Sequence, residues 1–294
     1  MWDFPRLHIA VLALGVSAAT LVFLPIFYAL LLVAVMGCFA HQAYLIFPYT
    51  RLAKTEVDLV KPKAASDVIS LLAVNVLMEN TRHDDLIAII EREDPDVLFL
   101  METDEVWHDA LKDVLAPYAT VKTRIQDDHY GLIFASRVEV EEFRLMTPSN
   151  DDTAALMAVL KDKNDTSFNF IGLHPRPPVP GNDTIARDEQ IKDAALMTSS
   201  CERPTVCMGD FNDAAWSWTS RRFKRYGGFF EPRVGRGMLS SFHAQYKLMR
   251  VPIDQLFVTK SVSLISFGRL EEFGSDHFPI SAKVFFDRPE GANK

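Results

Sequence analysis

The hydrophobic pattern divides the chain into a long uncharged N-terminal stretch and a later region of short alternating runs. No Asp, Glu, Lys or Arg occurs from Leu7 to Thr50. A helix that spans a bilayer needs about 20 apolar residues, so this stretch is long enough for two spans. Pro25, near its middle, is a natural break between helices. We therefore predict a membrane anchor in residues 1–47, a transmembrane helical hairpin with helices over about residues 7–23 and 26–47.

A cleaved signal peptide is the main alternative explanation of this stretch, since Ser17-Ala18-Ala19 resembles a cleavage site. The apolar core of a signal peptide is only about 7–15 residues long, however, and here a second apolar span follows directly. A hairpin buried inside a globular core is disfavoured, because no polar residues mark a side that faces solvent.

The charges at the two ends of the hairpin predict its orientation. Arg6 precedes the first span, and four basic residues follow the second: Arg51, Lys54, Lys61 and Lys63. Under the positive-inside rule, both ends of the hairpin lie in the cytoplasm. We therefore expect a multi-pass membrane protein, in contact with the lipid bilayer through the hairpin, whose C-terminal domain lies on the cytoplasmic side.

Residues 48–67 show no sustained period and are interpreted as a linker, and residues 289–294 as a C-terminal tail. Between them, residues 68–288 form a domain that we expect to fold without the hairpin. The predicted strands cover residues 68–76, 96–101, 131–136, 154–160, 168–173, 204–208, 252–259 and 278–286, and the predicted helices residues 84–93, 106–115 and 183–198. Many strands with few helices favour layered sheets with helices outside over a doubly wound parallel sheet.

Composition narrows the range of partners. The chain has 294 residues and a formal net charge of -8, from 39 acidic and 31 basic residues. Proteins that bind long nucleic acids non-specifically usually present a basic surface, so this charge argues against tight binding of duplex DNA. The cysteine spacing argues against a zinc site, and it leaves open whether Cys201 and Cys207 pair. No protein partner can be inferred.

Polar residues at the ends of the predicted strands are the candidate chemistry. In chain order they are Asn75, Glu102, His174, Asp210 with Asn212, and Asp276 with His277, and Asp254 lies inside an apolar strand. Carboxylates and amides on rigid strand ends can hold a hard cation for phosphoryl chemistry. Alone, Asn75 is typical of a turn and Glu102 of a helix start. Asp254 needs a partner if it is buried, and a histidine is a suitable one.

The ordered set resembles the endonuclease/exonuclease/phosphatase superfamily, which includes DNase I-like nucleases, inositol polyphosphate 5-phosphatases and bacterial sphingomyelinases. The motifs that carry the resemblance are Leu-Ala-Val-Asn-Val around Asn75, Asp-Val-Leu-Phe-Leu-Met before Glu102, Tyr130-Gly131-Leu132-Ile133-Phe134-Ala135-Ser136-Arg137, Ile-Gly-Leu-His-Pro around His174, Gly-Asp-Phe-Asn-Asp, Ile253-Asp254-Gln255-Leu256-Phe257 and Ser-Asp-His. They span essentially the whole of residues 68–286. The resemblance implies an α/β (α+β) four-layer sandwich, with two packed β-sheets flanked by helices. The hairpin resembles that of membrane-anchored bacterial members, which implies the bacterial inner membrane.

The resemblance also implies hydrolysis of a phosphoester that depends on Mg²⁺, with Mn²⁺ as a substitute. Glu102 would be the main metal ligand. Asn75 and Asp276 would complete the site or support its ligands.

The remaining residues would act on the substrate. Asp210 would orient or deprotonate the attacking water, and Asn212 would hold the phosphate or that water. His277, oriented by Asp254, would donate to the phosphate and stabilise its developing charge. His174 would be a second phosphate contact or would assist the leaving group.

Several nearby residues have two readings. Arg176, in a proline-rich loop after His174, either offers a bidentate donor to the substrate phosphate or belongs to a rigid connection. Arg187 could equally be a solvated charge. Trp216 and Trp218 either line the substrate groove or, the favoured reading, pack in the core. The basic-rich region could contact a polyanion or the membrane surface; it comprises Arg221, Arg222, Lys224, Arg225, Arg233 and Arg236.

We therefore expect a membrane-anchored, Mg²⁺-dependent phosphodiesterase, with nuclease activity as the leading form. A phosphoesterase acting on phospholipids or other small phosphorylated head groups is the alternative, and the acidic net charge fits a small substrate. A third reading is a non-catalytic binding module. Binding alone does not require both Glu102 and the Asp254–His277 pair, which argues against that reading.

Overall fold

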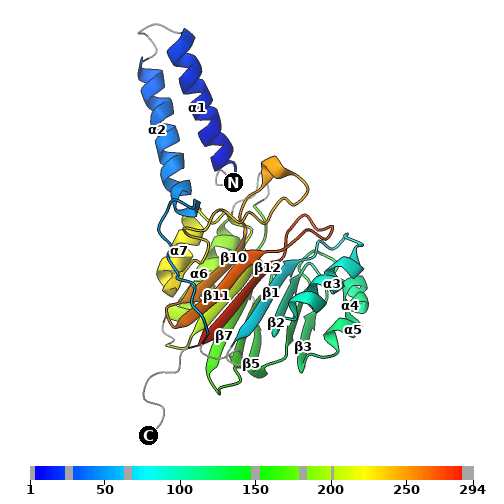
Figure 1. Cartoon of the computed structure of the whole chain (residues 1–294). Helices are drawn as coiled ribbons and strands as arrows, with labels where there is room; N and C mark the ends of the chain where they lie inside the picture. The colour runs from blue at the N-terminus through cyan, green and yellow to red at the C-terminus, as the bar shows by residue number, and fades with distance from the viewer. Residues whose placement is uncertain are drawn as a thin grey trace.

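Two apolar helices stand as a hairpin on one end of a layered domain (Figure 1). The computed structural model describes residues 4–23, 29–62, 68–146, 153–178, 184–199 and 202–286. The helices are α1 (Arg6–Phe23) and α2 (Ala29–Ile46), which pack against each other. The break expected at Pro25 lies outside the described residues. In the described part of the chain one apolar stretch, Leu30–Tyr49, is long enough to cross a membrane, and Arg6–Ala19 is a shorter apolar helix.

The domain contains two six-stranded sheets, with strand orders β11-β12-β1-β2-β4-β3 and β5-β6-β7-β8-β10-β9. The first comprises β1 (Ile69–Asn75), β2 (Val97–Met101), β3 (Thr120–Arg124), β4 (Leu132–Ser136), β11 (Val262–Arg269) and β12 (Ile280–Phe286). The second comprises β5 (Glu139–Met146), β6 (Ala155–Lys161), β7 (Ser167–Leu173), β8 (Thr205–Asp210), β9 (Phe229–Phe230) and β10 (Asp254–Thr259). The pair β1–β2 is parallel, as is β7–β8, and the neighbouring pairs β1–β12, β2–β4 and β8–β10 are antiparallel.

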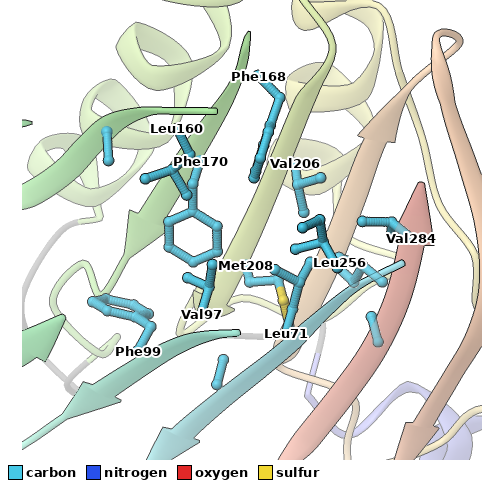
Figure 2. Close-up of a cluster of buried hydrophobic side chains, with 14 of the residues drawn as sticks. Leu71, Val97, Phe99, Leu160, Phe168, Phe170, Val206, Met208, Leu256 and Val284 are labelled. Atoms are coloured by element: carbon cyan, nitrogen blue, oxygen red, sulfur yellow. The ribbon is translucent and has the colours of Figure 1, made fainter. Parts of the chain in front are cut away.

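Apolar side chains of the continuous runs fill the space between the two sheets. Figure 2 shows Leu71 and Phe99 of the first sheet with Phe170 and Met208 of the second in one cluster. The rings of Phe99 and Phe170 meet edge to face with their centres 6.2 Å apart. All five residues of β2 are buried, which explains its uninterrupted apolar sequence, because a helix layer covers the other face of its sheet.

Helices cover the outer faces and complete four layers. The first sheet carries α3 (His83–Glu93), α4 (Glu105–Ala110) and α5 (Lys112–Leu115), and the second carries α6 (Ile185–Ser199) and α7 (Trp218–Gly227). The predicted arrangement of two packed sheets flanked by helices is confirmed. The helix predicted over residues 106–115 is instead two short helices, α4 and α5, that meet at Leu111.

The chain after α2 lies against the domain as far as residue 62, and we call residues 47–62 the docking segment. It begins with the 3₁₀ turn η2 (Phe47–Tyr49). The buried Tyr49 hydroxyl donates to the carbonyl of Ala215 at 2.6 Å and to the Glu231 carboxylate at 3.1 Å. Further along, the Val60 amide donates to the Leu264 carbonyl at 2.8 Å. The stretch predicted as a linker is therefore held at several points where it is described.

Candidate active site

The polar strand ends meet in one cavity of about 510 Å³ beside the base of the hairpin. Its polar lining comprises Glu102, Asp128, His129, Tyr130, His174, Asp210, Asn212, Asp276 and His277, and its apolar lining Phe4, Leu77, Pro177, Pro178, Phe242 and Ile253. The parallel pairs β1–β2 and β7–β8 bring four strand ends to this edge. The cavity lining therefore combines titratable groups with apolar side chains.

The turn after β8 positions Asp210 and Asn212. Gly209 has φ 142°, and a Cβ at this position would lie 2.1 Å from the carbonyl oxygen of Leu173. Asn212 has φ 48° and donates its amide N–H to Asp210 at 2.8 Å. Its side-chain amide donates to the Pro175 carbonyl at 2.9 Å. Backbone conformations that most residues avoid thus aim both side chains into the cavity, as is common at functional sites.

Asn75 joins the two carboxylates of the predicted site. Its side-chain amide donates to Glu102 at 2.8 Å and to Asp210 at 3.2 Å, and its oxygen accepts from the Leu77 amide at 3.1 Å. Asn75 thus supports these carboxylates in the described geometry. Glu102 itself has φ 61°.

The donors around Glu102 fit a hard divalent cation. Glu102 and Asp276 both line the cavity, and the Glu102 side chain is 15% exposed. Burial raises the pKa of Asp276; the nearby His277 partly offsets this rise, and Glu102 adds to it. Carboxylate oxygens gathered in this way need positive charge between them. Their oxygen atoms suit Mg²⁺ or Mn²⁺.

His277 lies between two buried carboxylates. Its Nδ1 is 2.8 Å from Asp254 and its Nε2 is 3.6 Å from Asp210. Burial lowers the pKa of His277, but the carboxylates of Asp254 and Asp210 outweigh this effect and raise the pKa to about 10. Burial raises the pKa of Asp210, and the positive charge of His277 partly offsets this rise. The imidazole is therefore a cation at neutral pH, with its Nε2 side toward the cavity.

Asp210, Asp254 and His277 lie close enough together to suggest a second metal centre. We assign no ion to this group. The imidazolium of His277 already supplies the positive charge that the two carboxylates need, and its Nδ1 is engaged by Asp254. The Glu102 side of the cavity is the better place for a cation.

His174 and Arg176 differ in their relation to the cavity. The buried His174 ring has its Nε2 3.7 Å from Glu102 and 3.9 Å from Asp210. Arg176 is exposed, and its guanidinium stacks over the ring of Tyr130, 5.4 Å from the ring centre. Tyr130 lines the cavity, so Arg176 lies at its rim, outside the described lining.

The open readings of two residues are resolved by burial. Arg187 is buried, and it donates to the Asn212 carbonyl at 3.0 Å and lies 3.6 Å from Asp213. It therefore stabilises the turn after β8. Trp216 is buried against Tyr49, so its packing role is confirmed. Trp218 is 56% exposed on α7, so the core-packing interpretation is wrong for Trp218.

Three residues of the site were missed by sequence reasoning. His129 places Nδ1 3.2 Å from Glu102. The Ser241 hydroxyl accepts from the Asp254 amide at 3.0 Å. The Ser275 hydroxyl accepts from the His277 amide at 3.0 Å and donates to the Asn75 carbonyl at 2.8 Å. His129 and Ser241 lie in loops without a periodic pattern. Ser275 stands beside Asp276 in the Ser-Asp-His motif, which was the available signal.

Solved structures with the same fold include proteins that act on different phosphoesters. The chain is similar to D. rerio TDP2 in complex with a single-strand DNA product, at 17% identity and a TM-score of 0.61, over 74% of this chain and 98% of that one. It is also similar to the mannosyl-6-phosphatase of Bacteroides thetaiotaomicron, at 16% identity and a TM-score of 0.57, over 74% of this chain and 100% of that one. No curated protein matches the chain by sequence.

The model of the Endonuclease/Exonuclease/phosphatase family matches residues 72–277. This range contains all the cavity carboxylates and histidines described above and excludes the hairpin. The chain therefore belongs to the Endonuclease/Exonuclease/phosphatase family and is a hydrolase that acts on phosphoester bonds.

Proposed function

We propose that the chain is a membrane-anchored, Mg²⁺-dependent phosphodiesterase whose active site is the cavity around Glu102, Asp210 and His277. One observation carries the proposal. The carboxylates of Glu102 and Asp276, which can hold a cation, line the same cavity as the charged imidazole of His277. A phosphodiester is an anion, so attack on it requires positive charge and hydrogen-bond donors to be in place beforehand.

The chain's own residues supply the acid–base chemistry. Asp210, buried and fixed by Asn75 and the Asn212 amide, accepts the proton of the attacking water. His277 donates from Nε2 to the charge that develops on the phosphate, and Asp254 holds the orientation of its ring. His174, near both Glu102 and Asp210, lies where it can contact the phosphate or the leaving group.

A divalent cation would be held by Glu102 and Asp276, with Asn75 orienting Glu102. When bound, it neutralises the phosphate and polarises its oxygens. Oxygen donors favour Mg²⁺, with Mn²⁺ as a substitute.

The hairpin supports the membrane anchor, for which we propose the bacterial inner membrane because of the resemblance to anchored bacterial members. Its apolar side chains point outward: Leu12 of α1 and Val33 of α2 are each 69% exposed. Only 17% of the most apolar 18-residue stretch within Leu30–Tyr49 is buried in the molecule, so α2 is not the core helix of a globular domain. The basic residues flanking the hairpin favour the cytoplasm for the catalytic domain.

Two classes of substrate fit this chemistry. A nucleic acid fits the nuclease reading favoured by the sequence. A phospholipid or other phosphorylated head group is favoured by one observation, the presence of Phe4, at the start of the hairpin, in the cavity wall.

Metal dependence tests the proposal. We expect the full-length chain in detergent to hydrolyse bis(4-nitrophenyl) phosphate with Mg²⁺ or Mn²⁺ and to stop in EDTA, with recovery when Mg²⁺ is restored. Full activity in the chelator without added metal would rule out the role of Glu102.

A further inference from the structure

The loop that brings Phe242 to the cavity carries an exposed apolar tip. The tip comprises residues 246–250 around the 3₁₀ turn η4 (Lys247–Met249). Tyr246 is 60% exposed, Leu248 85% and Met249 56%. Lys247 lies between Tyr246 and Leu248, and Arg250 follows Met249. Aromatic and aliphatic side chains between basic ones are the composition of segments that lie in a membrane interface.

The tip lies at the start of the hairpin. Figure 1 shows this loop, in orange, rising beside the lower end of α1. His8 of α1 contacts the Leu248 carbonyl through Nε2. The Leu248 backbone therefore lies level with the first turn of α1.

The polar residues at the open end of the hairpin indicate how deep in a bilayer this contact would lie. Arg6 donates to the Gln42 side chain at 3.0 Å, and this pair marks the polar boundary of the two helices. His8 is two residues further along α1, which corresponds to about 3 Å along the helix axis. In a hairpin that spans a bilayer, Leu248 would thus lie at the depth of the head groups, where interfacial segments bury their apolar side chains by about 5–10 Å.

Hydrogen bonds connect the residues just before the tip to the Ser-Asp-His segment of the cavity. The Ala244 amide donates to the Asp276 carbonyl at 2.7 Å, and the Gln245 side chain donates to the Ser275 carbonyl at 2.7 Å. The Phe242 ring lies 5.0 Å from the His277 ring and lines the cavity. A tip seated in the bilayer would therefore fix the cavity against the membrane surface.

We propose that residues 246–250 are a second membrane contact, and that the cavity receives a phosphoester carried by an amphiphile of the same leaflet. The phosphate would meet Asp210 and His277, and the apolar part would pass along Phe4 and Phe242. The inference rests on the proposed membrane-anchored phosphodiesterase and names its substrate class. Lys247 and Arg250 would favour anionic lipids. Their positive charges would offset part of the repulsion between these lipids and the acidic chain.

The depth of the tip can be measured directly. An environment-sensitive fluorophore is attached at Leu248→Cys in the full-length chain, with Cys38 and Cys201 replaced by serine, in nanodiscs of phosphatidylcholine and phosphatidylglycerol. Val106→Cys on α4, where Val106 is 60% exposed, is the control. We expect quenching by brominated lipids at position 248, and iodide quenching about fivefold weaker than at position 106. Equal iodide quenching at the two positions would overturn the membrane contact.

A second experiment separates the substrate class from the chemistry. The charged double variant Leu248→Glu with Met249→Glu is compared with Val106→Glu in the same nanodiscs. We expect the double variant to release soluble phosphorylated head groups about tenfold more slowly than the parent, the scale for losing one or two buried apolar side chains. Its hydrolysis of soluble bis(4-nitrophenyl) phosphate should be unchanged, and Val106→Glu should match the parent on both substrates.

The outcomes are distinguishable. If the parent hydrolyses the soluble ester with Mg²⁺ but releases no head groups, or if the double variant releases them at the parental rate, the inference about substrate fails and the proposed chemistry stands. If the parent cleaves single-stranded DNA and no lipid, the nuclease reading replaces it. If no metal-dependent hydrolysis of the soluble ester occurs, the proposed function itself fails.

Discussion

At the scale of single residues, His277 depends on two buried carboxylates with separate tasks. Asp254 holds Nδ1, and Asp210 faces Nε2. We expect Asp210→Asn and His277→Ala each to lower kcat by about a hundredfold or more, the usual scale for a lost base or transition-state donor. Asp254→Asn should cost less, because the imidazole remains in place. Hydrolysis of the soluble ester, with circular dichroism to confirm folding, provides the measurement.

A matched control for these variants is Asp85→Asn on α3. Asp85 is about half exposed and pairs with Arg82 at the surface, so its loss should leave kcat unchanged. Parental turnover by a folded Asp210→Asn variant would show that the chemistry takes place elsewhere.

The raised pKa of His277 predicts a dependence of stability on pH. Its pKa is about 10 in the folded chain, against about 6.5 for an unperturbed histidine. Its charge therefore contributes stability that is fully present below pH 6.5 and is lost as the pH rises toward 10. In EDTA, the stability advantage of the parent over His277→Gln in urea unfolding should shrink over this range. An advantage that grows with pH would contradict the ion pair.

At the scale of elements, Gly209 lets β8 lie close to β7 just before Asp210. Because its φ of 142° is open mainly to glycine and a Cβ would meet the Leu173 carbonyl at 2.1 Å, Gly209→Ala should destabilise the chain by about 2 kcal/mol or more. Gly268→Ala in β11 is the control, since no described atom lies within 4 Å of its added Cβ. It should change stability by less than about 0.5 kcal/mol. Urea unfolding of both variants tests the contrast, which equal stabilities would refute.

Most of the strands that the sequence predicted are largely buried. β2 and β8 are fully buried and appear as uninterrupted apolar runs. β5 was missed because it lies at a sheet edge with charged residues exposed along it. α7 was read only as a basic-rich region, because few of its residues face the core.

Several of the site residues that the sequence predicted also lie at the ends of buried strands, whereas those that it missed lie on loops. Asn75, Glu102 and Asp210 lie at or directly after buried strands, so the end of each apolar run marked them in the sequence. His129 and Phe242 come to the cavity on loops, whose paths depend on tertiary contacts that no local pattern encodes.

At the scale of the whole molecule, the docking segment contributes to the stability of the catalytic domain. Tyr49 is 4% exposed and donates to the buried Glu231, so its removal leaves a cavity and takes a hydrogen bond from that carboxylate. We expect a fragment of residues 68–288 to be less stable than one of residues 47–288 by about 3 kcal/mol. This corresponds to a Tm lower by about 6–12 °C. Equal melting curves for the two fragments would show that the docking segment links the hairpin to the domain without stabilising the domain.

The Tyr49–Glu231 contact also has a consequence for how the enzyme meets its substrates. Glu231 pairs with buried Arg233, which donates to the carbonyl of Asp254, the partner of His277. With the proposed membrane anchor, a loose tether would let the catalytic domain sample many heights above a bilayer, whereas this connection would hold the active site at one height. Among phosphoesters of equal reactivity, such an anchored enzyme would select those whose phosphorus lies at that distance from the membrane plane.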